Sequence, residues 1–403
     1  MTRVMHTSSS APTRLIVLGS TGSVGVQTLD TVAHLNAVAG PDSPRFEIVG
    51  LASASKRDML AEQARIWSVR HTALFRGEPG DASFVGENAA DELVRSIDCD
   101  MVVQAITGAA GVRSTLTAIE LGRDVALANK ESLVVAGALV VPRALERSVR
   151  ILPVDSEHAA LWQCLECVSP GQSPPFSVPA TVARAVLTAS GGPFRTWPLE
   201  RMANATPEDA LAHPTWNMGR KITIDCATMM NKAFEIVEAH WLFGLEPSRL
   251  GVVVHPQSII HAMTELIDGS TIAQLGSPDM RTPIQQALTA PRRLVGSAPR
   301  LSLETLGSLT FEAPDLARYP ALALAPRIIE LGGTAGAIVN AASEAAVEAF
   351  LDHRLPFLRI AQLASEALDA IGISAIRSLE DVLVADSEAR RFVALTIPTL
   401  SKA

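Results

Sequence analysis

Aromatic residues are scarce in this chain, and their scarcity argues against one class of function at once. Phenylalanine, tryptophan and tyrosine make up 4% of the 403 residues, and Tyr319 is the only tyrosine. Proteins that bind single-stranded nucleic acid stack the bases on aromatic side chains. Basic residues are also not in excess, because 34 Lys and Arg face 42 Asp and Glu and the net charge is −8. We therefore expect no nucleic-acid partner.

Cysteines and long apolar runs are few as well. Four cysteines cannot form a disulfide framework for a chain of this length, and no second pair completes a zinc site with Cys164 and Cys167. The most apolar uncharged run, residues 132–142, is about half as long as a membrane-spanning helix. Residues 1–13 are polar and lack the apolar core of a signal peptide, so we predict a disordered extension there. These absences predict a cytoplasmic protein with no membrane partner.

The chain does contain a regular alternation of apolar runs and helical periodicity. Its length predicts two to three domains. Continuous apolar strands separated by helices are typical of a parallel sheet covered on both faces. We predict an α/β fold whose parts are a Rossmann-type parallel-sheet domain (14–154), a less regular central α+β domain (155–291), a linker (292–326) and a C-terminal helical domain (327–403). The six expected strands are 15–18, 46–52, 72–75, 101–106, 125–128 and 151–154.

A glycine-rich turn follows the first apolar run. Gly19, Gly22 and Gly25 are spaced G-x-x-G-x-x-G, and an amphipathic stretch follows them. Glycines permit the tight turn, and a helix N-terminus presents N–H groups to a pyrophosphate. The spacing is a variant of the usual dinucleotide fingerprint, so a glycine turn without a nucleotide is the alternative.

The end of the second strand favours NADP(H) over NAD. An NAD site typically has a carboxylate there, whereas a 2′-phosphate needs a cation. Lys56 and Arg57 follow this strand, and no carboxylate precedes Asp58. The alternative is that both cations are solvated charges at the start of the next helix.

Polar clusters after the later strands indicate a metal and a phosphate site. Asp155 and Glu157 are two residues apart, so in an extended chain both carboxylates point to the same side. Oxygen ligands without sulfur select Mg²⁺ or Mn²⁺, although a surface turn explains most D-x-E pairs. Asn231 and Glu235 are neighbours on one face of a predicted helix, with Lys232 beside them.

Two loops complete the pattern. Residues 212–221 contain Trp216 between a proline and a glycine, with poor periodicity, and predict either a mobile lid or a loop whose indole lies in the core. Residues 189–194 form a glycine turn with the hydroxyl of Ser190, which suits a phosphate.

These motifs together resemble the 1-deoxy-D-xylulose 5-phosphate reductoisomerase family over nearly the whole chain. The resemblance rests on motifs that occur in this order: GSTGSVG (19–25), ANKES (128–132), PVDSEH (153–158), SGGPF (190–194), HPTWNMGRKITID (213–225), ATMMNKAFE (227–235), HPQSIIH (255–261) and GSPDMRTPI (276–284). It implies an NADPH domain, a central catalytic domain that also mediates dimerisation, and a C-terminal four-helix bundle.

The resemblance also implies roles for individual residues. Catalysis would involve Lys130, Glu157 and His213. Cofactor contacts would come from Gly19, Thr21, Gly22, Ser23, Val24, Ala54, Lys56, Asn129, Glu131 and Gly219. One divalent metal would bind Asp155, Glu157 and Glu235. Substrate contacts would come from Lys130, Ser156, Glu157, Ser190, His213, Trp216, Cys226, Asn231, Lys232 and Glu235.

The activity implied is the NADPH- and metal-dependent rearrangement and reduction of 1-deoxy-D-xylulose 5-phosphate to 2-C-methyl-D-erythritol 4-phosphate, in the methylerythritol phosphate pathway of isoprenoid precursor synthesis. The metal would be Mg²⁺ or Mn²⁺, with Co²⁺ as a further candidate, and the assembly a homodimer. The alternatives are another NADP-dependent dehydrogenase, such as a semialdehyde dehydrogenase, and a non-catalytic NADPH-binding dimer. One departure bears on the substrate: the family usually has serine where this chain has Cys226. On the second strand, the usual glycine and asparagine are Ala54 and Lys56.

Overall fold

The computed structural model describes residues 11–41, 43–216 and 218–400. Its largest sheet has seven strands, all parallel, in the order β4-β3-β2-β1-β5-β6-β7. Six of them coincide with the six predicted apolar runs, and β4 is additional. Their bounds are β1 (Thr13–Leu18), β2 (Phe46–Ser53), β3 (His71–Leu74), β4 (Phe84–Val85), β5 (Met101–Gln104), β6 (Asp124–Leu127) and β7 (Ile151–Pro153).

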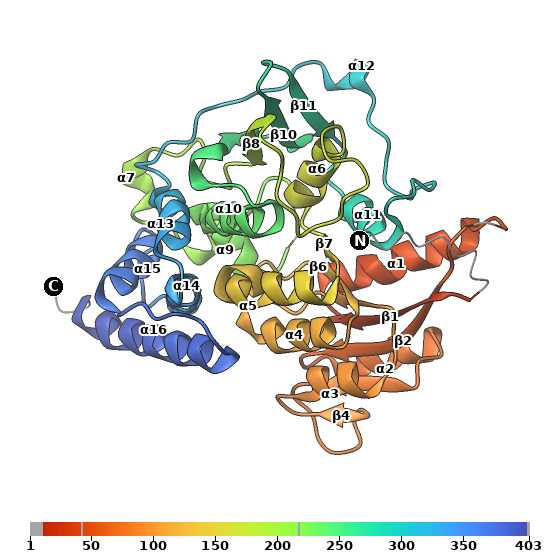
Figure 1. Ribbon diagram of the computed structural model, residues 1–403. Helices are drawn as coiled ribbons and strands as arrows, with labels where there is room; N and C mark the ends of the chain where they lie inside the picture. Colours follow the sequence, from red (N-terminus) through yellow and green to blue (C-terminus); the bar gives the residue numbers. More distant parts are fainter. Residues whose placement is uncertain (1–10, 42, 217, 401–403) are drawn as a thin grey trace.

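Helices connect these strands and cover both faces of the sheet (Figure 1). They are α1 (Ser23–Val38), α2 (Arg57–Ile66), α3 (Ala89–Ser96), α4 (Val112–Glu120) and α5 (Glu131–Arg147). Because both faces are covered, residues 15–18 of β1 are fully buried, which explains their continuous apolar sequence. The strand order reverses between β1 and β5, and open α/β sheets bind their ligands at such a point, beyond the carboxyl ends of the strands.

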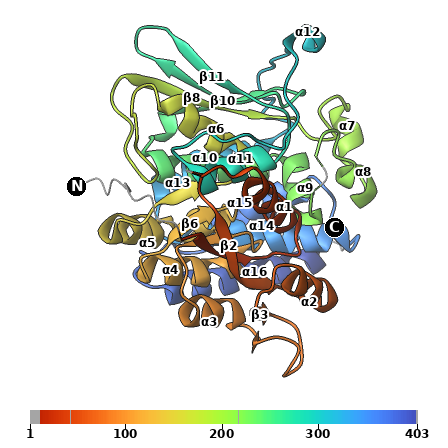
Figure 2. The same cartoon turned by 90° about the vertical axis from the view of Figure 1, so that its right-hand side faces the viewer.

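A second sheet of four strands lies at the opposite end of the molecule (Figure 2). Its strands β8 (Val182–Ala189), β9 (Leu250–Val254), β10 (Ile260–Leu266) and β11 (Thr271–Leu275) are ordered β11-β10-β8-β9. Pairing is antiparallel except between β8 and β9. Helix α6 (Ser156–Leu165) packs on this sheet, and α10 (Met230–Phe243) contacts both α5 and β9. Shorter helices α7 (Leu199–Met202), α8 (Pro207–Leu211), α9 (Arg220–Thr228) and α11 (Arg281–Thr289) complete this region.

The C-terminal part is helical, as expected. Helices α13 (Leu324–Leu331), α14 (Ala335–Leu351), α15 (Arg359–Ala370) and α16 (Leu379–Leu400) follow one another, and the breaks fall at the predicted Gly332-Gly333 and Pro356. Helix α14 packs against α15, α16 and α5. A Cβ at Gly336 would lie 1.9 Å from the carbonyl oxygen of Val134, so glycine is needed where α14 meets α5.

Two predicted segments differ from the structure. Residues 292–326 contain α12 (Leu303–Leu306) and the 3₁₀ helix η3 (Pro320–Ala323), and Glu312 pairs with Val254, so this segment is more structured than a linker. Strand β1 already begins at Thr13, inside the predicted extension, and residues 1–10 lie outside the described residues. The domain limits themselves stay predictions. Among the described residues, no helix is long and apolar enough to cross a membrane.

Candidate active site

The glycine turn after β1 has the geometry that a dinucleotide site needs. Gly19 has a φ of +80°, and a Cβ there would lie 2.5 Å from the carbonyl oxygen of Ala105. Gly22 precedes α1 without a side-chain cap, and Ser23 and Val24 are the first residues of the helix, so their N–H groups face outward from the helix end. The turn therefore places backbone donors at the point where the strand order reverses.

The predicted cations lie beside this turn. The Lys56 ammonium donates to the carbonyl oxygen of Thr21 at 3.2 Å, and the Thr21 hydroxyl contacts that of Ser53 on β2 at 2.6 Å. Arg57 pairs with Asp81 at 3.2 Å, and Ala54 is exposed. The end of β2 thus carries positive charge next to the glycine turn, as an NADP(H) site requires.

Asn129 and Glu131 lie at the end of β6, facing the turn that follows β5. The Asn129 amide donates to the carbonyl oxygen of Gly108 and to the Glu131 carboxylate, both at 2.9 Å. Lys221, on α9, pairs with Glu131 at 3.2 Å. Gly219 is the N-cap of α9, so two predicted cofactor residues and the start of this helix are near each other.

Three carboxylates meet next to these strand ends. The carboxylate oxygens of Asp155, Glu157 and Glu235 lie within 4.8 Å of one another, as the sequence predicted. The reason given for Asp155 and Glu157 was wrong, because the chain is not extended there. Asp155 is the N-cap of α6 and Glu157 lies in its first turn, whereas Glu235 comes from α10. Helix α6 and helix α10 together therefore assemble the cluster.

Two buried lysines hold this carboxylate cluster together. Lys130 is 2.5 Å from Asp155, 3.0 Å from Glu235 and 2.6 Å from the amide oxygen of Asn231. Lys232 is 2.6 Å from Glu157 and also contacts Glu235. Burial alone would lower the pKa of Lys130, but the carboxylates around it raise that pKa, so the ammonium stays charged.

This donor set suits a hard divalent cation. All three acidic groups offer oxygen, and no sulfur lies among them. Burial raises the pKa of Glu235, and the neighbouring Glu157 raises it further, which is the repulsion that a bound cation relieves. The ammonium groups of Lys130 and Lys232, which both pair with Glu235, offset part of this repulsion. The residues present thus fit a divalent metal.

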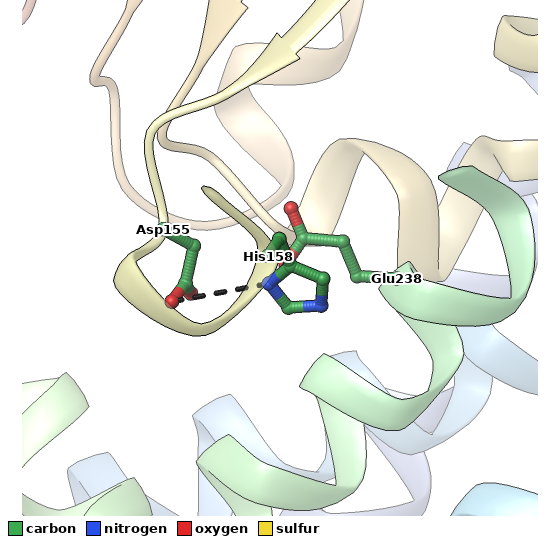
Figure 3. Close-up of side chains that lie close together, drawn as sticks. All are labelled: Asp155, His158 and Glu238. Carbon is green, nitrogen blue, oxygen red and sulfur yellow. Dashed lines mark ion pairs between the residues drawn. The ribbon is translucent and has the colours of Figure 1, made fainter. Parts of the chain in front are cut away.

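The sequence did not identify the pair that supports Asp155. Figure 3 shows His158 of α6 directed toward Asp155, with Glu238 of α10 close by. The His158 ring donates from Nε2 to the backbone carbonyl of Glu235 at 2.8 Å, and its Nδ1 is 3.3 Å from Glu238. Burial would lower the pKa of His158, but Glu238 and Asp155 raise it to about 9. Glu238 follows Glu235 by one helical turn, and this spacing was the available signal.

The predicted phosphate and lid residues lie close together. The Ser190 hydroxyl is 3.1 Å from Nε2 of His213, and burial lowers the pKa of that imidazole. The backbone N–H of Trp216 donates to Nδ1 of His213 at 2.9 Å, and the indole is half-buried rather than a core side chain. Tyr319 donates to the carbonyl oxygen of Gly191 at 2.7 Å, which fixes the turn after Ser190.

Cys226 and Ser156 complete the set of predicted substrate residues. Cys226 lies on α9, is half-buried, and has no disulfide. Burial raises the pKa of its thiol far above the ordinary value, with Glu235, Lys130 and Lys232 near enough to affect it. The Ser156 hydroxyl donates to the Glu157 carboxylate at 2.5 Å. Most predicted substrate residues are thus gathered around one centre.

A nucleotide-binding sheet joined to an all-oxygen metal site defines the class as a metal-dependent oxidoreductase. Three family models match the chain: 1-deoxy-D-xylulose 5-phosphate reductoisomerase over residues 15–137, its C-terminal domain over 151–243, and the DXP reductoisomerase C-terminal domain over 275–392. Curated reductoisomerases of Anaeromyxobacter dehalogenans and Ralstonia nicotianae are each 47% identical to it. The first alignment covers 94% of this chain and 95% of the relative, and the second 94% and 96%.

Solved structures of reductoisomerases are also similar to this chain. The Zymomonas mobilis reductoisomerase in complex with NADPH has a TM-score of 0.83 and 40% identity, covering 96% of this chain and 99% of that one. A DOX-P reductoisomerase in complex with NADPH, fosmidomycin and magnesium has a TM-score of 0.89 and 37% identity, covering 97% and 100%. This chain belongs to the 1-deoxy-D-xylulose 5-phosphate reductoisomerase family. The predictions of the α/β fold, of an NADPH- and metal-dependent enzyme and of its family are confirmed.

Proposed function

We propose that this chain converts 1-deoxy-D-xylulose 5-phosphate to 2-C-methyl-D-erythritol 4-phosphate. We also propose that the residues described above bind the cofactor, the metal and the substrate in this reaction. The reaction, in the methylerythritol phosphate pathway, follows from the family. The observation that carries the proposal is the cluster of Asp155, Glu157 and Glu235, which lies just beyond the carboxyl ends of the parallel strands. Open α/β sheets bind nucleotides at this edge, so metal and hydride donor meet there.

The polar residues around the carboxylate cluster act on the substrate's reacting end. When bound, the divalent metal held by the three carboxylates polarises the substrate's ketone and hydroxyl oxygens, and NADPH supplies the hydride. Lys130 remains charged and lies between Asp155 and Glu235, so its ammonium can hold a substrate oxygen on which negative charge develops. Ser156 lies beside Glu157 and orients the same end.

The residues assigned to the phosphate end lie next to the carboxylate cluster, because Lys232 pairs with Glu157 and Asn231 contacts Glu235. Asn231 and Lys232 lie in the first turn of α10, Cys226 lies on α9, and Ser190 follows β8, so three parts of the chain supply the proposed phosphate contacts. His213 links Ser190 to the loop that carries Trp216. Phosphate binding therefore favours closure of this loop, which excludes water from the aldehyde intermediate.

The test follows NADPH oxidation with purified full-length enzyme and 1-deoxy-D-xylulose 5-phosphate. We expect activity with Mg²⁺ or Mn²⁺, loss of activity in EDTA, and recovery when the metal is returned. Asp155→Asn should reduce kcat/KM by at least about a hundredfold. Asp124→Asn is the matched control, because Asp124 begins β6, at the opposite end of that strand from the site, and pairs with Arg150. Activity that persists in EDTA would instead favour a metal-independent dehydrogenase.

We also propose that the enzyme is a homodimer formed through the open side of the second sheet. An open groove of about 850 Å³ lies there, lined by side chains that include Val252, Met263, Phe311 and Leu316. Phe311 is 45% exposed and Leu316 is 60% exposed, and apolar surface of this kind is typical of an interface. Leu316→Glu should shift the dimer toward the 42.7 kDa monomer in sedimentation. Leu395→Glu, equally exposed on α16, should not, and a monomeric wild type would contradict the proposal.

A cytoplasmic location is part of the same proposal. All four cysteines are free, as expected for a reducing compartment. Cell fractionation followed by activity measurement tests it, and activity in a secreted fraction would contradict it.

A further inference from the structure

The C-terminal helices meet the cofactor side of the molecule through a cluster of charged residues. Arg390 of α16 pairs with Glu344 of α14 at 2.5 Å. Lys221 of α9 pairs with Glu131 of α5 at 3.2 Å and with Asp225 at 2.8 Å. We call these five side chains the polar junction. Four helices that are far apart in the sequence thus contribute charge to one place.

Glu344 reaches the turn that follows β5. Gly108 in this turn has a φ of +73°, and a Cβ built on it would lie 2.8 Å from the Glu344 carboxylate. The Gly108 carbonyl oxygen accepts from Asn129, which also donates to Glu131. Strand β5 is the neighbour of β1 at the point where the strand order reverses. A carboxylate of the C-terminal helices therefore lies against the edge of the nucleotide crevice.

The charges of the polar junction depend on one another. The side chains of Glu131, Asp225 and Glu344 are 10%, 4% and 14% exposed, and Arg390 also pairs with Asp386 at 2.7 Å, so the shielded carboxylates outnumber the two cations. Burial raises the pKa of Glu344, and the charges of Lys221 and Arg390 oppose that rise. If the Glu344 charge is removed, the ion pairs that Lys221 forms with Glu131 and Asp225 change in strength.

Simple packing does not require this arrangement. About two helical turns before Glu344, α14 lies against α5 through Gly336, where the nearest atoms belong to the Val134 backbone and the Ile328 side chain. At the junction, buried polar atoms of Asn340, Ser343 and Asp225 lack a hydrogen-bond partner, which is costly in a contact that only packs. A cluster that leaves buried polar atoms unpaired is expected if the polar junction serves the cofactor site and does not only join helices.

We infer that Glu344, held by Arg390, is a positioning residue of the NADPH site, through which the C-terminal helices set the affinity for NADPH. It fixes the Gly108 turn directly and acts on Glu131 through Lys221. Because Lys221 is the second residue of α9, the same contacts fix the end of the lid segment at Gly219. The inference rests on the proposed contacts of Asn129 and Glu131 with NADPH.

The test measures NADPH dissociation constants of the full-length enzyme by fluorescence titration, together with KM and kcat. Glu344→Gln keeps the shape and removes the charge, so Kd and KM for NADPH should rise by about three- to tenfold, with kcat at saturation within about twofold. Asp369→Asn is the matched control, since Asp369 pairs with Arg327 in the same helical domain, away from the junction. It should leave both constants unchanged.

A double-mutant cycle separates this inference from a structural effect. In a Lys221→Met background, Glu344→Gln should raise Kd by a clearly smaller factor than in the wild type, because only the direct contact with the Gly108 turn remains. Glu344→Asp, which keeps the charge but withdraws it from the Gly108 turn, should give an intermediate Kd and serves if Glu344→Gln does not fold.

Three results would overturn the inference: a Glu344→Gln enzyme that binds NADPH as the wild type does, equal weakening by Asp369→Asn, or strict additivity with Lys221→Met. A wild type that binds no NADPH would overturn the proposed function as well, whereas the first three results would leave that function standing.

Discussion

Among single residues, Cys226 differs most in chemistry from what the resemblance leads one to expect. The family usually has serine at this position, and a thiol is a weak hydrogen-bond donor. The charges of Glu235, Lys130 and Lys232 are near enough to affect its thiol, and the two ammonium groups suit a phosphate. A hydrogen bond to a charged group contributes about 1.5–3 kcal/mol.

Cys226→Ser should therefore lower KM for the phosphorylated substrate by about tenfold or more, with kcat little changed. Steady-state kinetics at saturating NADPH measures this KM. Cys226→Ala is the matched variant and should not lower KM, because it adds no donor. An unchanged or higher KM in Cys226→Ser would show that binding of the substrate's phosphate does not depend on this side chain.

His261 makes the stability of the fold depend on pH. It is 7% exposed, and burial together with the charge of Lys232 lowers its pKa to about 4. Between pH ~6.5 and ~4 the unfolded chain binds a proton here that the folded chain does not, so stability is lost as pH falls through this window. Denaturant unfolding at pH 7 and pH 5 measures this loss. Between these two pH values, the free energy of unfolding of His261→Gln should fall by about 2 kcal/mol less than that of the wild type. Equal losses in both proteins would contradict this assignment.

Much of the site could be predicted from single residues, but not how they meet. Asn231 and Glu235 were placed correctly, because helical periodicity links residues four apart. Asp155 and Glu157 were paired for the wrong reason, since their spacing does not reveal that α6 begins at Ser156. His158 and Glu238 form their contact across two helices 80 residues apart in sequence, and such tertiary contacts leave no local pattern.

At the scale of elements, local chemistry predicted strands and helices better than their arrangement. Continuous apolar runs and glycine breaks predicted six strands of the first sheet and the break between α13 and α14, but α13 begins at Leu324, three residues before the predicted helical domain. The parallel pairing of β8 with β9 could not be predicted, because α7, α8, α9 and α10 separate these strands in the sequence and no local pattern links them. Strand β4, with two residues, is too short for any periodicity.

The contact between α14 and α5 allows a sharp test. A methyl group at Gly336 would lie 1.9 Å from a backbone carbonyl that cannot move aside, so Gly336→Ala should reduce the free energy of unfolding by about 1–3 kcal/mol. Gly372→Ala is the control, since nothing lies within 4 Å of its Cβ position. It should be neutral or slightly stabilising. Chemical denaturation compares the two, and equal stabilities would contradict the tight contact.

For the whole molecule, the proposed metal site links segments that the chain keeps far apart. Lys130 follows β6, Asp155 is the N-cap of α6, and Glu235 lies on α10. A cation that binds only the folded state stabilises it by about 2.7 kcal/mol at a hundred times its Kd. Mg²⁺ should therefore raise Tm of the wild type but not of Glu235→Gln, as measured by calorimetry. An equal rise in both proteins would place the ion elsewhere.

The hydrogen bond from Tyr319 to Gly191 has a practical consequence, because the chain has one tyrosine. Biosynthetic replacement of tyrosine by a fluorinated analogue puts one ¹⁹F nucleus in the protein, directly behind the turn that ends at Gly192. Its spectrum contains one protein resonance and needs no assignment. Binding of phosphate at the site proposed beside Ser190 can then be followed by a chemical-shift change in a protein of this size, without any substitution in the site itself.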